Sequence, residues 1–446
     1  MTKLTHVIKR DGSIVPFTPE RIANAIYRAA VAVDGRDKER AESLAAQVVA
    51  ALEEVVPEGE YPTIETIQDM VEKVLIENSH ARVAKAYILY RDERARQRAK
   101  RGDADKTPSG NIPWAKLWQV LDWSVSHEVH TSQKLNQKIR DGKLHEIVTA
   151  AEAAYSEDVE NAANLILDRK DEVRVVFIAG PSSSGKTTTT IKVGERLARQ
   201  GFKLITLNID HYFFDLEMHP KDEFGDYDFE TPQALNMRLI NQNLSDLFAG
   251  KEVRIPFYDF KTGHSVPEHT PMRLNKNEIV LIDSLHGLYP EMTEDIPDEW
   301  KFKLYIEPLL QLKLNNGRYA RWTDIRLMRR MLRDASHRAY DPTQTLLHWH
   351  YVRSSELRHI IPYLNSVDTI VNSAMPYELP IYKAKLGENF ARWAEEYHDD
   401  PLRKDAWERA DRVNRMFQEI DAVEDDSFVP EDSVIREFIG GGVYKY

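Results

Sequence analysis

The stretch Val173–Thr188, VRVVFIAGPSSSGKTT, decides the fold of this chain. An apolar, β-branched run ends abruptly in GPSSSGKT (180–187), which matches G-x-x-x-x-G-K-[ST], and a helical pattern follows it. This strand–loop–helix context is the one in which the motif binds phosphate. Its glycines let the backbone curl so that successive N–H groups point at an anion, and the helix N-terminus adds partial positive charge. The sequence therefore predicts a nucleoside triphosphate site.

The residues of this loop have distinct expected roles. The Lys186 ammonium is expected to reach the β- and γ-phosphates of ATP, and the Thr187 hydroxyl to ligate Mg²⁺. Backbone and hydroxyl groups supply the other phosphate contacts, at Gly180, Ser182, Ser183, Ser184, Gly185 and Thr188. ATP and Mg²⁺ are thus the predicted cofactors.

Composition limits the other classes of function. The chain has 446 residues, enough for two or three domains, and its 42% hydrophobic and 30% charged residues are ordinary for a globular protein. The net charge of -12 argues against nucleic acid as the main partner. No apolar run approaches a membrane span, and the N-terminus lacks a signal-peptide pattern. The absence of cysteine excludes disulfides, so we expect a cytoplasmic protein without a membrane partner.

Five short apolar runs, mostly separated by helical patterns, predict an α/β fold with a doubly wound parallel sheet. They are Val173–Ile178, Lys203–Ile209, Glu278–Asp283, Phe302–Ile306 and Val367–Val371. In such sheets the chemistry gathers at the carboxyl ends of the strands. Asp210 directly follows the second run and Asp283 ends the third, so both carboxylates are candidates for the site.

The N-terminal segment predicts a hairpin followed by helices. Asp11-Gly12 is a strong hairpin turn signal, and Thr18 with Pro19 marks a helix start. VIKRDGSIVPFTPERIANAI, together with VEKVLIENSHARVAKAYILYRDERAR, resembles the ATP-cone, a small regulatory nucleotide-binding module best known from ribonucleotide reductases, over residues 3–95.

The ATP-cone resemblance implies a second nucleotide site with ATP or dATP as effector. The family's phosphate-contacting pair matches Lys9 and Arg10, and Arg21 replaces a family lysine on the first helix. Clustered cations suit a polyphosphate, so we prefer a second, regulatory nucleotide site to the alternative of a solvated charged turn.

Four ordered motifs after the phosphate loop resemble the uridine kinase/phosphoribulokinase family, over about residues 173–385. They are NIDHYF (208–213), DYDFETPQALN (226–236), PFYDFKTG (256–263) and RLMRRMLRDASHRAYD (326–341). The resemblance implies that Asp210 is the catalytic carboxylate, which accepts the proton of the acceptor hydroxyl. Asp283 matches the carboxylate that holds Mg²⁺, although the family commonly has Glu-Gly where this chain has Asp283-Ser284.

The same resemblance assigns a lid and an acceptor pocket. Arg330 and Arg333, with Lys186, are expected to stabilise the transferring phosphoryl group, and Arg338 to contact the ATP phosphates. Glu230 stands where nucleoside kinases carry an aspartate that binds ribose hydroxyls. The family's base-reading histidine falls at Gly263, one residue before His264. The other expected acceptor residues are Tyr212 and Tyr258, which could equally be core aromatics.

We divide the chain into an ATP-cone (1–95), a linker and helical connector (96–170), a kinase-like domain (171–385) and a C-terminal helical extension (386–446). The ending SVIREFIGGG (433–442) also resembles the tail of bacterial multidomain uridine kinase-like proteins. RARQRAKR (94–101) indicates a solvated helix end more than a nucleic-acid patch, and the histidines near 127–130 lack the spacing of a metal site.

Together these features predict an ATP-dependent kinase that phosphorylates a hydroxyl under adenine-nucleotide control. The leading candidate acceptor is the 5′-OH of a nucleoside. A homo-oligomer is expected. One alternative is a phosphoribulokinase-like or other sugar or metabolite kinase, with a sugar phosphate as substrate. Another is a nucleotide-sensing regulator with a degenerate kinase core.

Overall fold

The structure, a computed structural model, describes residues 3–8, 14–31, 33, 35, 37–57, 60–78, 80–88, 112–219, 227, 229–275, 278–337, 341–400 and 403–445. The chain divides into two compact units. One comprises residues 1–109, 212–236 and 258–266, and the other 110–211, 237–257 and 267–446. Among the described residues, no helix is long and apolar enough to cross a bilayer.

The N-terminal part of the first unit is a hairpin followed by helices. Strands β1 (His6–Ile8) and β2 (Ile14–Pro16) pair antiparallel, which confirms the predicted hairpin. Helix α1 (Pro19–Val31) begins at the predicted proline, and α2 (Lys38–Val55), α3 (Ile64–Glu77) and a helix over 81–88 follow. The apolar faces of these helices meet in one core, which includes Ile26, Leu44, Val48, Leu52, Val71 and Leu75.

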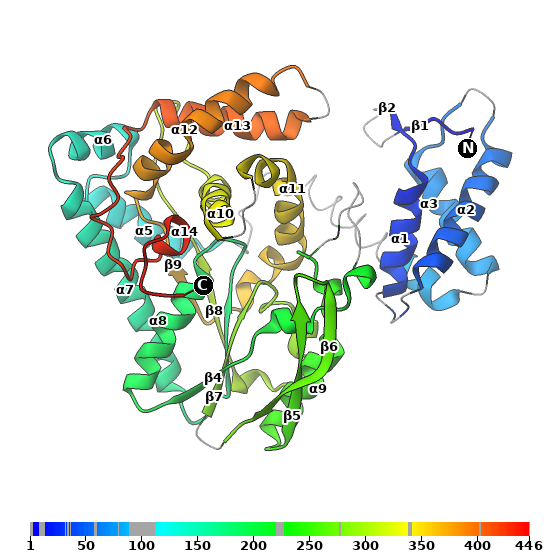
Figure 1. Cartoon of the computed structure of the whole chain (residues 1–446), viewed down its shortest axis with the longest axis horizontal. Helices are drawn as coiled ribbons and strands as arrows, with labels where there is room; N and C mark the ends of the chain where they lie inside the picture. The colour runs from blue at the N-terminus through cyan, green and yellow to red at the C-terminus, as the bar shows by residue number, and fades with distance from the viewer. Residues whose placement is uncertain are drawn as a thin grey trace. The chain divides into compact units, whose positions relative to one another are not determined.

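The second unit is built on a five-stranded sheet in the order β4-β7-β3-β8-β9, with every neighbouring pair parallel (Figure 1). The strands are β3 (Val175–Ala179), β4 (Lys203–Thr206), β7 (Glu278–Ser284), β8 (Lys301–Glu307) and β9 (Thr369–Asn372). The five predicted strands are therefore confirmed; two of them start at the predicted residue, and the other ends are shifted by one to three residues. Since β4 and β7 lie on one side of β3, and β8 and β9 on the other, the strand order reverses at β3.

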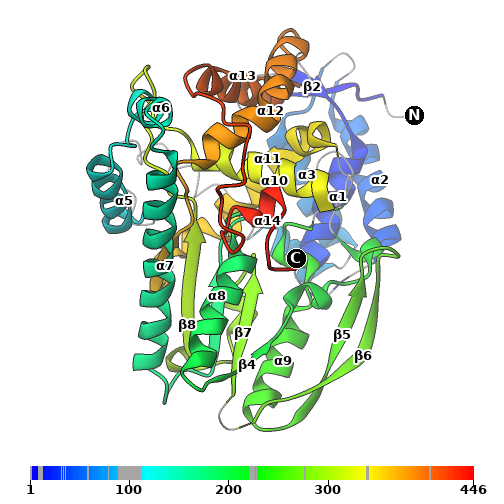
Figure 2. The same ribbon diagram turned by 60° about the vertical axis from the view of Figure 1, so that its left-hand side comes forward.

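The sheet is buried on both faces, as a doubly wound sheet requires. In β3, Val176 and Ile178 enter the large core, whereas Ala179 enters a smaller cluster on the opposite face with Tyr305 of β8. Helix α8 (Lys186–Arg199), which follows the phosphate loop, packs beside α7 (Leu144–Asp168) on the large-core face (Figure 2).

Further helices complete the second unit. They are α5 (Trp114–Ser126), α6 (Ser132–Arg140), α9 (Met237–Phe248), α10 (Trp322–His337), α11 (Pro342–His359), α12 (Glu378–Glu396), α13 (Lys404–Gln418) and α14 (Arg436–Ile439). Strands β5 (Glu252–Asp259) and β6 (His264–Arg273) form a two-stranded ribbon that was not predicted from the sequence.

The connector and the C-terminal extension share the large core with the sheet. Residues of α7 and α13, and Val429, Val434 and Ile435 of the C-terminal segment, belong to the same cluster as Ile178. The C-terminal segment is therefore an integral part of this unit.

We expect Ile435→Ala to lower the free energy of unfolding by about 2–4 kcal/mol, because the side chain is fully buried and its removal leaves a cavity. Val443→Ala, at a position 55% exposed, is the matched control and should change it by less than about 0.5 kcal/mol. Chemical denaturation of the full chain measures both. Equal small effects would contradict the placement of the segment in the core.

Candidate functional site

The phosphate loop connects the carboxyl end of β3 to α8, and its two glycines are required by close contacts. A Cβ at position 180 would lie 2.3 Å from the Ile306 carbonyl oxygen. At Gly185 φ is +92°, and an added Cβ would lie 2.5 Å from a methyl group of Val434. Ser183 also has a positive φ of 60°, which is unusual for a residue with a side chain. The loop therefore has the tightly curled backbone that the motif predicts.

Thr187 and Asp283 form the pair of oxygen ligands that the sequence assigns to a metal. The Thr187 hydroxyl donates to Asp283 Oδ2 at 3.2 Å. Strand register explains the proximity, because β7 lies beside β3 and Asp283 is the register partner of Ile178, shortly before the loop. A hydroxyl and a carboxylate are ligands that suit Mg²⁺, which takes its other ligands from phosphate and water. The residues present therefore fit this metal.

Three charged groups act on the Asp283 carboxyl. Burial raises its pKa to about 6, the Lys186 ammonium opposes the rise, and the carboxylates of Glu437 and Asp210 add to it. Lys186 itself donates to the Pro181 carbonyl oxygen at 3.3 Å, so its ammonium lies at the phosphate loop. Asp210 lies shortly after the end of β4, in the short 3-10 helix Ile209–Tyr212, and its side chain is exposed. Lys186, Asp283 and Asp210 are therefore within electrostatic reach of one another.

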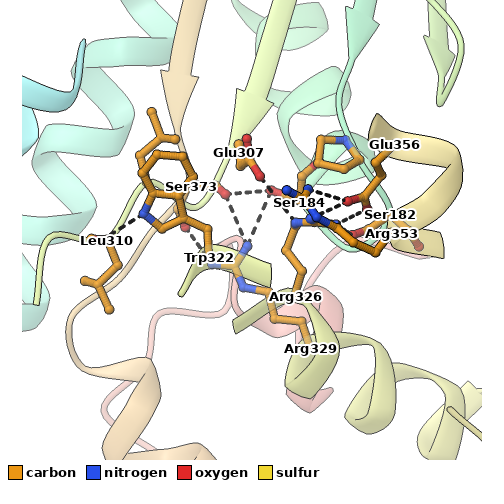
Figure 3. A network of polar contacts seen from close by, with 12 residues as sticks. Ser182, Ser184, Glu307, Leu310, Trp322, Arg326, Arg329, Arg353, Glu356 and Ser373 are labelled. Atoms are coloured by element: carbon orange, nitrogen blue, oxygen red, sulfur yellow. Dashed lines mark hydrogen bonds and ion pairs between the residues drawn. The ribbon is translucent and has the colours of Figure 1, made fainter. Parts of the chain in front are cut away.

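Two buried arginines of α10 donate hydrogen bonds to backbone carbonyl oxygens of the phosphate loop (Figure 3). Arg326 Nη1 donates to the Ser182 carbonyl oxygen at 3.1 Å, and Arg329 donates to the carbonyl oxygens of Ser184 and Ser373. Each arginine has a buried carboxylate partner. Glu356 pairs with Arg326, and Glu378 binds Arg329 in a fork with distances of 2.8 and 3.1 Å.

Arg326 and Arg329 belong to the motif RLMRRMLRDASHRAYD, in which only Arg330, Arg333 and Arg338 were predicted to be site residues. Both are fully buried. The sequence does not show this burial, so it could not distinguish the two arginines from surface cations. Ion pairing with Glu356 and Glu378 raises the pKa of each guanidinium despite burial, and both arginines remain charged.

Two of the predicted lid arginines, Arg330 and Arg333, also lie in α10. Arg330 Nη1 donates to the Ser182 hydroxyl at 3.0 Å, and its Nε donates to Asp334 at 3.2 Å. Arg333 lies within 3.5 Å of the same Asp334 carboxylate. The structure thus brings Arg330 to the phosphate loop, while the predicted Arg338 lies outside the described residues.

The predicted phosphate contact at Thr188 has a partner that the sequence did not reveal. Both the backbone N–H and the hydroxyl of Thr188 donate to Glu437 Oε2, at 3.2 and 2.8 Å. Glu437 lies in α14, inside the tail SVIREFIGGG, and is buried. By contrast, the Ser183 and Ser184 hydroxyls are buried without a hydrogen-bond partner among the described residues.

In the first unit, one expected acceptor residue, Tyr258, belongs to an aromatic cluster. Phe213, Phe229, Tyr258 and Phe260 contact one another and His219, with ring centroids 4.7 to 6.5 Å apart. Tyr258 is buried there, and burial raises the pKa of its hydroxyl. Tyr212 is also buried, and its carbonyl oxygen accepts from the Asn236 N–H. Glu230 is partly exposed, next to Phe229.

The position of the family's base-reading histidine cannot carry a side chain in this chain. Gly263 has φ +73°, and an added Cβ would lie 2.8 Å from Leu216 Cβ. The predicted His264 is exposed at the start of β6, where its Nδ1 lies 3.8 Å from Asp215 Oδ1.

Of the predicted regulatory residues, Lys9 and Arg10 lie outside the described residues. Arg21 is exposed on the first turn of α1, near the described end of β2 in sequence.

Comparisons with known proteins match two separate parts of the chain. The ATP cone domain model matches residues 5–96, and the phosphoribulokinase/uridine kinase family model matches residues 175–379. The chain joins an ATP-cone to a domain of the phosphoribulokinase/uridine kinase family. The kinase-family domain contains the loop, both candidate carboxylates and the α10 arginines described above.

Individual relatives agree with this assignment. A uridine kinase of Deinococcus deserti is 27% identical over 198 residues, which are 44% of this chain and 86% of that protein. The uridine-cytidine kinase B of Dictyostelium discoideum is 25% identical over 198 residues, covering 44% and 73%. A vitamin B12-dependent ribonucleoside-diphosphate reductase of Thermoplasma acidophilum is 43% identical over 96 residues, 20% of this chain and only 12% of the reductase.

Among solved structures, a possible uridine kinase from Bacillus stearothermophilus is similar with a TM-score of 0.31 and 17% identity. The match covers 48% of this chain and 98% of that one.

We expect Asp283→Asn to stabilise the metal-free kinase domain at pH 7. A folded pKa of about 6, above the ordinary 3.8, means that the folded state holds the proton more tightly than the unfolded state. Stability therefore falls as the pH rises from about 4 to about 6, and the ionised carboxylate costs about 3 kcal/mol at pH 7. Thermal unfolding in chelator should show a higher Tm for the variant at pH 7, with the difference lost below pH 4. A lower Tm at pH 7 would contradict the assigned environment.

Glu378→Gln should lower the free energy of unfolding by about 3–5 kcal/mol, because Arg329 would keep a buried charge without its anion. Glu42→Gln, in an exposed pair with Lys38, is the control and should change it by less than about 0.5 kcal/mol. Urea unfolding of the two variants measures the contrast.

Proposed function

We propose that the protein is an ATP-dependent kinase that transfers the γ-phosphoryl group of ATP to a hydroxyl of a small metabolite. The leading candidate acceptor is the 5′-OH of a nucleoside. The observation that supports the proposal is that Lys186 and the Thr187–Asp283 pair meet at one phosphate loop, and that the Asp210 carboxylate is close enough to act on Asp283. Phosphoryl transfer requires chiefly positioning and charge stabilisation, and these residue types provide both.

Each residue has a specific part in the proposed transfer. The loop N–H groups and Lys186 hold the triphosphate, and Thr187 and Asp283 provide the ligands for Mg²⁺. The metal, when bound, neutralises charge on the phosphate oxygens. Asp210 orients the acceptor hydroxyl and accepts its proton, since a carboxylate within reach of the nucleophile serves as general base. Arg330, beside Ser182, and Arg333 add positive charge against the transferring group.

The acceptor class is inferred from the first unit and from the relatives. Glu230 offers a carboxylate that can accept from both hydroxyls of a ribose diol. The neighbouring aromatic cluster, with Tyr258, offers flat apolar surface for a base. Several relatives are named uridine kinases, which favours a nucleoside.

A sugar phosphate is the second candidate acceptor, and Gly263 favours it. Since no side chain fits at this position, the family's histidine contact to a base is absent here. Exposed His264 beside Asp215 does not replace it by position. A kinase of this family that acts on a phosphorylated sugar needs no base contact.

We further propose that the ATP-cone senses ATP or dATP through Lys9, Arg10 and Arg21, and that regulation involves a homo-oligomer in the cytoplasm. The match of residues 5–96 to the ATP cone model supports the nucleotide effector.

We expect Asp210→Asn to lower kcat by about 10²–10⁴-fold with little change in ATP affinity, because only the proton acceptor is lost. Lys186→Ala should weaken ATP binding as well. ATP consumption is measured across uridine, cytidine, ribulose 5-phosphate and other pentose phosphates, with and without dATP. Turnover with a pentose phosphate alone would replace the nucleoside assignment by the second candidate. Full activity of Asp210→Asn would contradict its role.

A further inference from the structure

The C-terminal segment places a buried carboxylate on the phosphate loop's own donors. Glu437 Oε2 accepts from the N–H and the hydroxyl of Thr188, which is the third residue of α8. Gly185, at the N-cap position of α8, has no side chain with which to cap the helix. Glu437 therefore does what an N-cap carboxylate normally does, from a position 249 residues further along the chain. Free N–H groups in this first turn are the ones that bind phosphate in a loop of this kind.

The carboxylate cannot leave this position without moving a large apolar assembly. Val434 and Ile435 are fully buried in the main core, and a methyl of Val434 occupies the space that a Cβ at Gly185 would need. Phe438 is also fully buried, and the Arg329 guanidinium lies 4.9 Å from the centre of its ring. The residues before and after Glu437 are thus fixed to the loop and to α10.

Polar contacts fix the same segment to both flanking helices. Asp432 accepts from Lys192 of α8 at 2.7 Å, and Ser433 donates to Glu152 of α7. Arg436, also buried, donates to the Val429 carbonyl oxygen at 2.8 Å and to Asp426 at 3.2 Å, which closes the segment on itself. A detachable latch would have few such contacts, so the segment is a permanent wall of the site.

We infer that Glu437 is a fixed anion built into the phosphate loop, which competes with the nucleotide phosphate for the Thr188 donors and so sets the affinity for ATP. The inference rests on the proposed function, because it assumes that this loop binds ATP. Glu437 is a positioning residue, since it acts through Thr188 and by its charge. Its carboxylate also acts on Asp283, so the charge is felt across the site.

The deciding substitution is Glu437→Gln, which keeps an acceptor for Thr188 and removes the charge. We expect the variant to bind ATP about fivefold to tenfold more tightly than the unaltered chain, since a like charge close to the phosphates is removed from a largely buried site. A residue with only a structural role would give unchanged or weaker binding. Glu437→Asp, which keeps the charge, should not tighten binding.

Asp432→Asn is the matched position control, because it breaks a contact between the same segment and α8 without touching Thr188. Its ATP affinity should equal that of the unaltered chain. Equal tightening by Asp432→Asn and Glu437→Gln would overturn the inference, because loosening of the segment would then explain both. Thermal unfolding identifies any variant that does not fold. Glu437→Asp then shows whether a substitution at position 437 that keeps the charge leaves the ATP affinity untightened.

The measurement is calorimetric titration of MgATP into the full chain, with Lys186→Ala identifying which binding event belongs to the phosphate loop rather than to the ATP-cone. Tightening of the Lys186-dependent event in Glu437→Gln alone supports the inference. A Lys186-dependent event that is unchanged or weaker in this variant overturns the inference and leaves the proposed function intact. Absence of any Lys186-dependent event in either protein would contradict both.

Discussion

The backbone carbonyls of the phosphate loop need partners, and buried arginines provide them. A loop that turns its N–H groups inward toward an anion turns some carbonyl oxygens the other way, and an unsatisfied buried carbonyl is costly. Arg326 and Arg329 donate to the carbonyls of Ser182 and Ser184. The curled shape of the loop is therefore held by the protein before any ligand binds, which reduces the cost of ordering the loop on binding.

This solution imposes a second requirement, because each buried guanidinium needs an anion of its own. Glu356 and Glu378 meet it, and Glu307 lies 3.5 Å from Arg326 Nε. Burial raises the pKa of Glu307, and the Tyr305 hydroxyl donates to it at 2.7 Å. The loop thus depends on α10, α11, α12 and β8 together, because their side chains form one polar network around the two arginines.

Local sequence patterns were sufficient for the parts of the site that are close in sequence or set by strand register. The strand–loop–helix pattern predicted the loop, and the carboxyl end of a β-strand predicted Asp283, which the parallel pairing of β3 and β7 then placed against Thr187. The first hairpin and the start of α1 followed from turn and capping residues. These features depend on neighbours within a few residues or on one sheet rule.

The remaining contacts depend on pairs that no local pattern connects. The spacing of Arg326, Arg329, Arg330 and Arg333 is equally typical of a solvated helix face, and their partners lie 30 and 49 residues away for the first two. Thr188 and Glu437 are separated by 249 residues. The tail motif carries no local sign that its Glu437 accepts from Thr188 or that Asp432, just before it, pairs with Lys192 of α8.

The buried arginines at the loop are each paired with a carboxylate, and this pairing determines how the site can discriminate between ligands. Arg326 and Arg329 are matched by Glu356 and Glu378, and Glu437 sets a carboxylate against the first turn of α8. In the proposed kinase, phosphate is therefore held by a few directed donors, above all Lys186, Arg330 and the loop N–H groups, which lie at the loop. Directed donors reward a ligand that fits the loop, whereas a diffuse field attracts any polyanion. A buried anion at the helix N-terminus thus trades affinity for selectivity.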